Sequence, residues 1–187
     1  MKLLRLIAAL AVVSALTGCV AAVVGGAGTA ALVGADRRTV GTVTEDSAIE
    51  LKAGNRISDK FPDAHINVTS YNRMVLVTGE TTSNAAKLEI ERIARAVENV
   101  RGVYNEVAVV GNSSLTARAN DSYLTSKVKA RFVDGNKFNA VHVKVVTEAG
   151  VVYLLGMVNH QEADDATEIA RTTSGVQKVV RLFEFLD

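Results

Sequence analysis

The sequence predicts an α+β protein that contains two tandem domains, each with the element order α-β-β-α-β. Two observations lead to this prediction. One pattern of residues occurs twice along the chain, and within each copy apolar residues recur first at helical and then at alternating spacings. The composition is that of a globular protein, with 48% hydrophobic and 22% charged residues. The near balance of 21 basic and 20 acidic residues argues against nucleic acid as a partner, and a single cysteine excludes an internal disulfide.

The repeat covers most of the chain after its first quarter. Its two copies keep the same order of segments with only small changes in loop length. We therefore expect domains at residues 44–110 and 117–187, joined by a polar, turn-rich linker at 111–116. The clearest correspondences are Asp46–Lys52 with Asp121–Lys127, Ile66–Thr69 with Val143–Val146, and Val75–Gly79 with Val152–Gly156.

Each domain is expected to begin with a short helix. Asp46 and Asp121 are good N-cap residues, and apolar residues at helical spacing follow each of them. Upstream of the first helix, the run Val40–Val43 is a candidate for an additional edge strand. The helical apolar positions are Ile49, Ala53 and Ile57 in the first domain, and Leu124, Val128 and Phe132 in the second.

A β-hairpin follows each of these helices. Runs of alternating apolar residues flank Asn72-Arg73 in the first domain and Glu148–Gly150 in the second, and such runs around a short turn are typical of hairpins. The strands are expected at His65–Tyr71 and Met74–Gly79, and at Val141–Thr147 and Val151–Gly156.

A second helix and a final strand complete each domain. Asn99 and Gly175 close the helices, because both residue types tolerate a left-handed cap. A strand that is reached across a helix by a right-handed crossover pairs in parallel with its neighbour. Each domain is therefore a three-stranded mixed sheet packed against two helices, and because such small domains have thin cores we expect the two to pack on each other. The amphipathic helices are expected at Ser83–Val97 and Gln161–Thr173, and the final strands at Val103–Val109 and Val179–Phe185.

Residues 1–18 have the features of a secretory signal peptide. Lys2 and Arg5 precede the apolar run Leu6–Leu16. The segment Leu16–Cys19 resembles a bacterial lipobox, which implies cleavage before Cys19 and acylation of its thiol with palmitate-type chains. Residues 19–43 are then a lipidated N-terminus and a flexible tether. Because Val20 is not the Asp that marks inner-membrane retention, the resemblance implies an outer-membrane lipoprotein that faces the periplasm.

An uncleaved transmembrane helix is the alternative interpretation of this segment. No charged residue occurs between Leu6 and Ala35, and a membrane span needs only about 20 apolar residues. The glycine-rich stretch Gly25–Ala30 disfavours this alternative, because clustered glycines weaken a helix. Replacement of Cys19 separates the two interpretations, since only the lipoprotein would become soluble.

The repeated unit resembles the BON domain. Its motif has three parts in order. A strand ends in the pattern aliphatic-x-Gly, a helix that contains Ile-Ala follows, and a final strand closes the unit. Two such units behind a lipobox are similar to dual-BON outer-membrane lipoproteins, and the resemblance spans essentially the whole chain. It implies binding of anionic phospholipid, support of outer-membrane integrity, location at cell-division sites, contact with the β-barrel assembly machinery, and no enzymatic activity. The matching segments include Ile66–Thr69, Val103–Glu106 and Val143–Val145.

In that family, lipid contact is assigned to the first helix of the second unit. The corresponding segment here, Arg118–Arg131, contains four basic residues and one acid, whereas Asp46–Arg56 in the first unit has two of each. Tyr123 has the polar-tipped ring that suits a headgroup interface, although a member of the family carries Trp there. Lysine side chains extend their charged ends to phosphates. The candidate lipid-binding residues are Tyr123, Leu124, Lys127, Val128, Lys129 and Arg131.

These residues also have structural interpretations. Tyr123 and the lysines fit a solvated helix face, and Leu124 and Val128 fit a core. His65, His142 and His160 lie far apart without metal-ligand spacing, so we expect no metal site, and we expect no catalytic residues and no cofactor. The functional alternatives to lipid binding are an adaptor that docks an envelope protein through a hairpin or an open sheet edge, and a periplasmic packing protein without a specific ligand.

Overall fold

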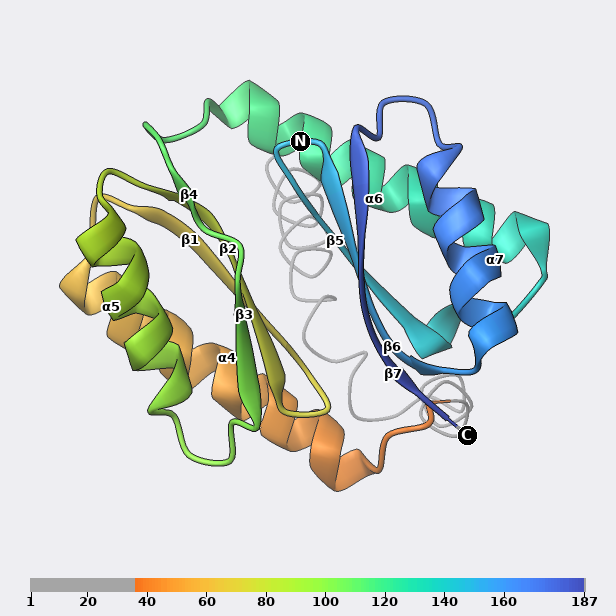
Figure 1. Cartoon of the computed structure of the whole chain (residues 1–187), viewed down its shortest axis with the longest axis horizontal. Coiled ribbons are helices and arrows are strands. Elements are labelled where there is room, and N and C mark those ends of the chain that lie inside the picture. Colours follow the sequence, from red (N-terminus) through yellow and green to blue (C-terminus); the bar gives the residue numbers. More distant parts are fainter. Residues whose placement is uncertain (1–35, 187) are drawn as a thin grey trace, which may run out of the picture. The chain divides into compact units, whose positions relative to one another are not determined.

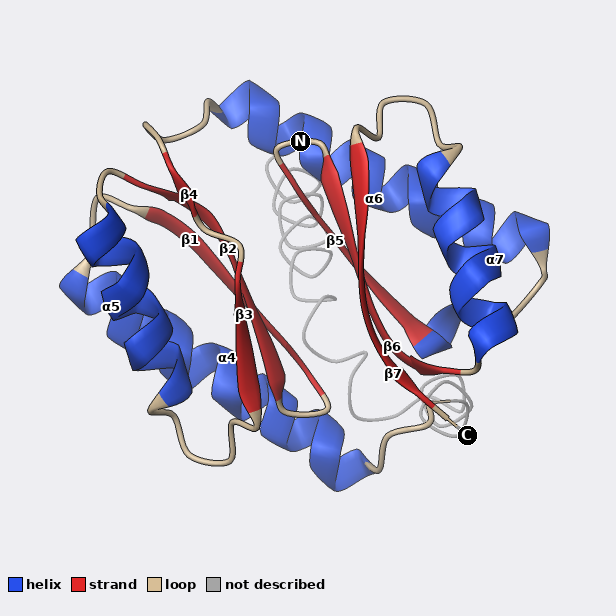
Figure 2. Ribbon diagram, in the orientation of Figure 1, coloured by secondary structure: helices blue, strands red, loops and turns tan. Residues whose placement is uncertain are grey.

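The computed structural model describes residues 36–186. They form two domains, each of which contains one sheet and follows the same order of helices and strands (Figures 1 and 2). The predicted signal peptide, Cys19 and most of the predicted tether lie outside the described residues. The first half contains the helices α4 (Val40–Lys60) and α5 (Asn84–Arg95), and the strands β1 (His65–Tyr71), β2 (Met74–Thr81), β3 (Gly102–Asn105) and β4 (Ala108–Val109).

The second half repeats this arrangement. In both halves the hairpin strands are antiparallel, and the strand after the second helix pairs in parallel with the central strand. The predicted order α-β-β-α-β and the mixed sheets are thus confirmed. The elements are the helices α6 (Leu115–Gly135) and α7 (His160–Arg171), the short 3-10 helix η1 (Ala140–His142), and the strands β5 (Val143–Glu148), β6 (Val151–Val158) and β7 (Lys178–Phe185).

The hairpin turns lie where the sequence predicts them. Asn72 and Arg73 have φ of 51° and 65°, and Ala149 and Gly150 have φ of 49° and 75°. Two successive residues with positive φ match the twist of a two-residue hairpin. Asn99 and Gly175 also adopt positive φ, of 66° and 101°. The prediction that they close the helices is wrong, however, because α5 and α7 end at Arg95 and Arg171, with Ala96 and Thr172 as C-caps.

The predicted starts of the first helix in each domain are wrong. Helix α4 begins at Val40 after the N-cap Thr39, so Val40–Val43 forms helix rather than an edge strand, and the predicted tether overlaps its first turn. Helix α6 likewise begins at Leu115 after the N-cap Ser114, inside the predicted linker. Asp46 and Asp121, expected as N-caps, therefore lie within these helices, and both are buried.

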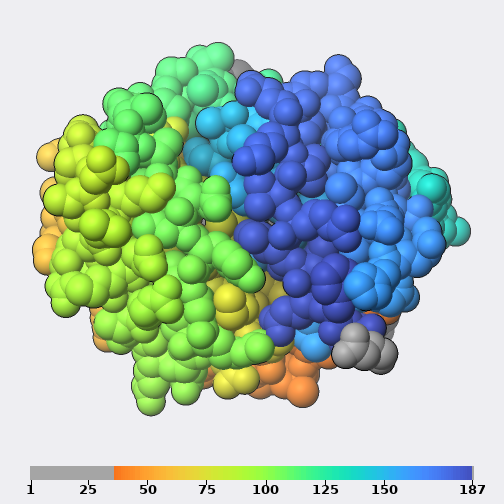
Figure 3. Space-filling model, viewed as in Figure 1, coloured from red at the N-terminus to blue at the C-terminus, as the bar shows by residue number. Residues whose placement is uncertain are grey.

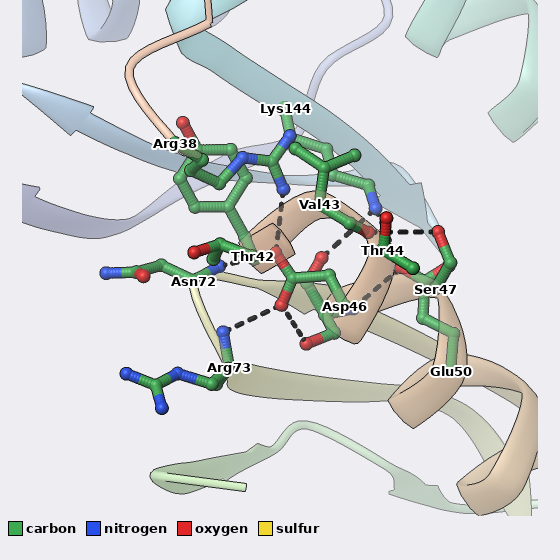
Figure 4. A network of polar contacts seen from close by, with 12 residues as sticks. Arg38, Thr42, Val43, Thr44, Asp46, Ser47, Glu50, Asn72, Arg73 and Lys144 are labelled. Atoms are coloured by element: carbon green, nitrogen blue, oxygen red, sulfur yellow. Dashed lines mark hydrogen bonds and ion pairs between the residues drawn. The ribbon is translucent and has the colours of Figure 1, made fainter. Parts of the chain in front are cut away.

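Each buried aspartate instead binds the turn of its own hairpin. The Asp46 carboxylate accepts hydrogen bonds from the backbone N–H groups of Asn72 (2.9 Å) and Arg73 (2.7 Å). Figure 4 shows Asp46 between these turn residues and Arg38, whose guanidinium lies 2.9 Å away. In the second domain Asp121 accepts from Ala149 and Gly150, both at 2.9 Å. The repeated aspartate thus joins helix to hairpin in both copies.

The predicted strand Val103–Val109 is divided into two parts. Strands β3 and β4 both pair in parallel with β2, and between them the backbone N–H of Glu106 donates to the Val77 carbonyl at 2.9 Å. Val107, in this interruption, is fully buried in the core of the first domain, together with Ile49, Ile90 and Val77. The interrupted segment thus still contributes an apolar side chain to the core.

The central strand of each sheet is buried on both faces. Val75 and Val77 pack beneath α4 and α5, whereas Leu76 points to the opposite face. Val152 and Leu154 of β6 likewise face α6 and α7, while Tyr153 and Leu155 face away from them. This double burial explains why both strands have nearly continuous apolar sequences.

The helix-free faces of the two sheets pack against each other. Tyr71 and Leu76 of the first domain form one buried cluster with Tyr153 and Leu155 of the second. Ion pairs also join the two domains, at 2.7 Å between Lys144 and Glu50 of α4, and at 2.9 Å between Arg101 and Glu184. In the space-filling view the green segment that contains β3 adjoins the dark blue β7 (Figure 3). The expected packing of the two domains is confirmed.

Arg37, which lies three positions before α4, also contacts the second domain. Two guanidinium nitrogens of Arg37 donate to the two carboxylate oxygens of Glu162 at 2.6 and 2.9 Å, and one of them also donates to the carbonyl of Met157 at 2.8 Å. The hydrogen-bonded guanidinium holds the pKa of Glu162 below its usual value. The chain is thus held to α7 shortly before it enters α4.

Tyr153 is expected to make stability fall at high pH. Burial raises the pKa of its phenol to about 12, and the charges of Glu106 and Glu148 contribute to this rise. Because an unfolded tyrosine ionises near pH 10 and the folded one does not, stability is fully present below pH 10 and is lost as the pH approaches 12, by about 2 kcal/mol. Urea unfolding of Tyr153→Phe and wild type between pH 9 and 12 measures this. An equally steep loss in Tyr153→Phe would contradict it.

Candidate functional site

Helix α6 is fixed in place at both ends and along one face. The Ser114 hydroxyl accepts the backbone N–H of Ala117 at 3.2 Å, and Asn136 ends the helix in the left-handed conformation with φ of 43°. The inner face buries Leu124, Val128 and Phe132 in the core of the second domain. The outer face of α6 is therefore presented on a rigid element.

This outer face combines small, aromatic and basic residues. At 100° per residue, Ala119, Ser126 and Ala130 lie at its centre, and all three are exposed or partly exposed. Tyr123 lies on one side of this centre with 62% of its surface exposed, and Lys129 lies on the other side, also exposed. Asp121 is buried, so the exposed face carries no carboxylate between Leu115 and Val133. The exposed Asp134 follows in the last turn of the helix, on the same side as Tyr123.

The two lysines differ in their surroundings. Lys127 donates to the carbonyl of Ser174 at 3.0 Å, and its ammonium lies 5.9 Å from the centre of the Tyr123 ring. Lys129 makes no hydrogen bond or ion pair within residues 36–186, so its charge faces solvent. An exposed aromatic ring beside one lysine and across from another is suited to a surface with negative headgroups.

Three of the predicted lipid-binding residues have internal roles. Leu124 and Val128 are 2% and 0% exposed and pack in the core, so they cannot contact a membrane while the helix is folded. The Arg131 guanidinium donates to the Ile169 carbonyl at 2.8 Å and to the Thr173 hydroxyl at 2.7 Å, at the C-terminal end of α7. The set that remains at the surface is Tyr123, Lys127 and Lys129.

The first domain supports this structural interpretation of Arg131. Its counterpart in the repeat, Arg56, donates to the carbonyl of Ala96 at 3.4 Å, at the end of α5. Tyr123 and Lys129, by contrast, correspond to Ala48 and Gly54, which offer neither ring nor charge. The two copies therefore share the internal contacts and differ at the exposed face of the first helix.

One polar cluster at the domain interface is missed by the sequence analysis. The Nδ1 atom of His65 lies 2.9 Å from a carboxylate oxygen of Glu80 and 3.9 Å from one of Glu148. His65 and Glu80 face each other across the first hairpin, so the hairpin register predicts that pair. Glu148 belongs to the other domain, and no local pattern indicates its approach.

A helix that spans a membrane needs about 20 predominantly apolar residues. None of the helices within residues 36–186 is both long enough and apolar enough to cross a bilayer.

The chain is similar in sequence to several known proteins. The chain is 41% identical over 176 residues to the outer membrane lipoprotein DolP of Haemophilus influenzae, covering 92% of this chain and 91% of that protein. It is 30% identical to a 21 kDa hemolysin of Actinobacillus pleuropneumoniae, covering 81% and 79%. It is 33% identical to the osmotically-inducible protein Y of Escherichia coli, covering 75% and 72%.

The two halves of the chain match one domain family. Residues 45–111 match the BON domain, and residues 120–187 match it a second time. Each match contains one hairpin with its aspartate-bound turn, the second helix and the final parallel strand. The chain therefore belongs to the BON-domain family and carries two copies of that domain.

Proposed function

We propose that this chain is an outer-membrane lipoprotein, acylated at Cys19 and facing the periplasm, whose second BON domain binds anionic phospholipid through the exposed face of α6. The observation that carries the proposal is the exposed Tyr123 with Lys127 beside it and Lys129 across the same face of α6. The similarity to an outer membrane lipoprotein and the lipobox-like segment Leu16–Cys19 support the location.

The expected contact is weak by itself. Each basic residue close to an anionic surface contributes about 1 kcal/mol at low salt, so Lys127 and Lys129 supply about 2 kcal/mol. The tyrosine ring adds interfacial burial. A lipid anchor holds the domain near the bilayer, and the resulting high effective concentration makes such a contact useful for choosing between membrane regions. By the same family resemblance, we propose roles in outer-membrane integrity and at division sites, with the β-barrel assembly machinery as a protein partner.

A tryptophan in place of Tyr123 is expected to report this contact directly. The chain contains no Trp, so Tyr123→Trp introduces a single probe whose emission shifts to shorter wavelength when it enters a headgroup region. In reconstituted vesicles the shift should appear with phosphatidylglycerol, be absent with phosphatidylcholine, and weaken with salt. The matched control is Leu51→Trp, at a 65% exposed position of α4, which should not respond to the lipid charge.

Charge reversal tests the same surface independently. In the Tyr123→Trp background, Lys129→Glu should reduce the spectral shift, whereas Lys52→Glu makes the same charge change on α4 and should leave it intact. Equal responses of the Tyr123→Trp and Leu51→Trp proteins, or a shift that is insensitive to lipid charge, would contradict lipid binding by α6. The adaptor alternative, in which an open sheet edge docks an envelope protein, would then be the better account.

A further inference from the structure

The interface between the two domains contains three metal-ligand side chains that converge on one point. The ligand atoms of His65, Glu80 and Glu148 all lie within 4.8 Å of one another. Their side chains are 16%, 6% and 9% exposed, so the group is almost closed to solvent. His65 opens β1, Glu80 lies near the end of β2, and Glu148 ends β5 of the other domain.

The spacing of these atoms is close to that of a coordination sphere. Protein nitrogen and oxygen ligands bind Zn²⁺ at about 2.0–2.2 Å, which places neighbouring ligands of a tetrahedral site about 3.4 Å apart. The two distances from the His65 Nδ1 atom, 2.9 Å to Glu80 and 3.9 Å to Glu148, lie on either side of this value. Small shifts of these side chains therefore bring the three atoms around one ion.

The charge of the cluster also favours a cation. Within residues 36–186 neither Glu80 nor Glu148 forms an ion pair with a lysine or arginine. Arg118 reaches Glu80 only through Ser113, whose hydroxyl lies 3.1 Å from the guanidinium Nε and donates to the carboxylate at 3.2 Å. Burial of two carboxylates whose negative charges are only partly balanced raises the free energy of the folded state. A bound divalent ion would offset both charges.

The surroundings orient one ligand and provide a route of entry. The side-chain amide nitrogen of Asn67 donates to a carboxylate oxygen of Glu148 at 3.0 Å, which fixes the direction of that carboxylate. A cavity of about 390 Å³, lined in part by His65, Asn67 and Glu148, opens next to the cluster. It leaves room for a water molecule as the fourth ligand.

We propose that His65, Glu80 and Glu148 bind one Zn²⁺ ion that joins the two BON domains. One imidazole nitrogen and two carboxylate oxygens form a borderline ligand set that suits Zn²⁺ better than Mg²⁺ or Ca²⁺, which prefer oxygen alone. Because β1 and β2 supply two ligands and β5 the third, the ion exists in this form only when the domains are docked. Binding would therefore stabilise the docked state.

The test measures Zn²⁺ binding and stability in the same samples. Full-length protein in detergent is stripped with EDTA and titrated with Zn²⁺ against a fluorescent chelator, and its melting temperature is recorded with and without the ion. We expect one ion per chain with micromolar or tighter affinity and a rise in Tm of several degrees. Glu148→Gln should weaken binding at least tenfold and remove the rise in Tm.

A matched substitution separates ligand loss from a general charge effect. Glu168→Gln removes a carboxylate from the exposed face of α7 and should leave affinity and the rise in Tm unchanged. Equal Zn²⁺ affinity in Glu148→Gln and wild type, or a wild-type Tm that does not respond to Zn²⁺, would overturn the proposal. The cluster would then be a hydrogen-bond network between the domains.

Discussion

Replacement of Asp46 by Ala is expected to lower the free energy of unfolding by about 3–5 kcal/mol. The Asp46 carboxylate accepts the backbone N–H groups of Asn72 and Arg73 and the hydroxyl of Ser70, and it pairs with Arg38. Its side chain is only 4% exposed, so water cannot fully replace it. Each buried donor left without an acceptor costs about 1–3 kcal/mol.

Urea unfolding followed by circular dichroism measures this loss. Ser47→Ala is the control, because the exposed hydroxyl of Ser47 only bonds back to the Val43 carbonyl of its own helix, and its removal should change stability by less than about 0.5 kcal/mol. Asp121→Ala should also destabilise the protein, but by less, since Asp121 binds the two N–H groups of the second turn without counterparts of the Ser70 and Arg38 contacts. A loss below about 1 kcal/mol for Asp46→Ala would refute the assigned role.

Replacement of Gly79 by Ala is expected to be more damaging still and to prevent the first sheet from forming in its present register. Gly79 has φ of +113°, a conformation that side chains disfavour, and an added Cβ would overlap the carbonyl of His65 on the neighbouring strand. The obstacle is backbone, which cannot rotate away as a side chain does. We expect a loss of more than about 4 kcal/mol, seen as insoluble protein or a strongly lowered unfolding midpoint.

The same substitution elsewhere in the chain provides the control. Gly54 lies in α4, and a Cβ at this position would meet nothing within 4 Å. Gly54→Ala should therefore raise stability by about 0.5–1 kcal/mol, because alanine favours a helix. If Gly79→Ala unfolded at a urea concentration similar to that of Gly54→Ala, the glycine that ends the aliphatic-x-Gly motif would have no steric role.

Local patterns predict the strands better than the helix starts. Alternation and turn residues predict β1 at its observed bounds, and β2 and β6 start as predicted but run two residues further. Asp46 and Asp121 have the sequence context of N-caps, but their carboxylates bind turn residues more than 20 positions away. A single sequence does not reveal whether an aspartate accepts from its own helix or from a distant hairpin, because both need the same side chain.

The sequence predicts which helix carries the candidate site, but it does not predict the role of every residue on that helix. The basic excess of α6 and the ring of Tyr123 are visible in the sequence, and helical spacing already marks Leu124 and Val128 as core positions. The role of Arg131 depends on where α7 ends beside it, and that of Glu148 on the docking of the two sheets. These are tertiary contacts, which composition and periodicity do not encode.

The paired contact of Arg37 has a mechanical consequence. Tension that enters the molecule from the N-terminal side meets the Arg37–Glu162 clamp before it reaches the first turn of α4. The force is therefore divided between the two domains. One part is transmitted along α4 of the first domain, and the other is transmitted through the bidentate Arg37–Glu162 contact to the second domain. This arrangement opposes separation of the two domains under force applied at the N-terminal side.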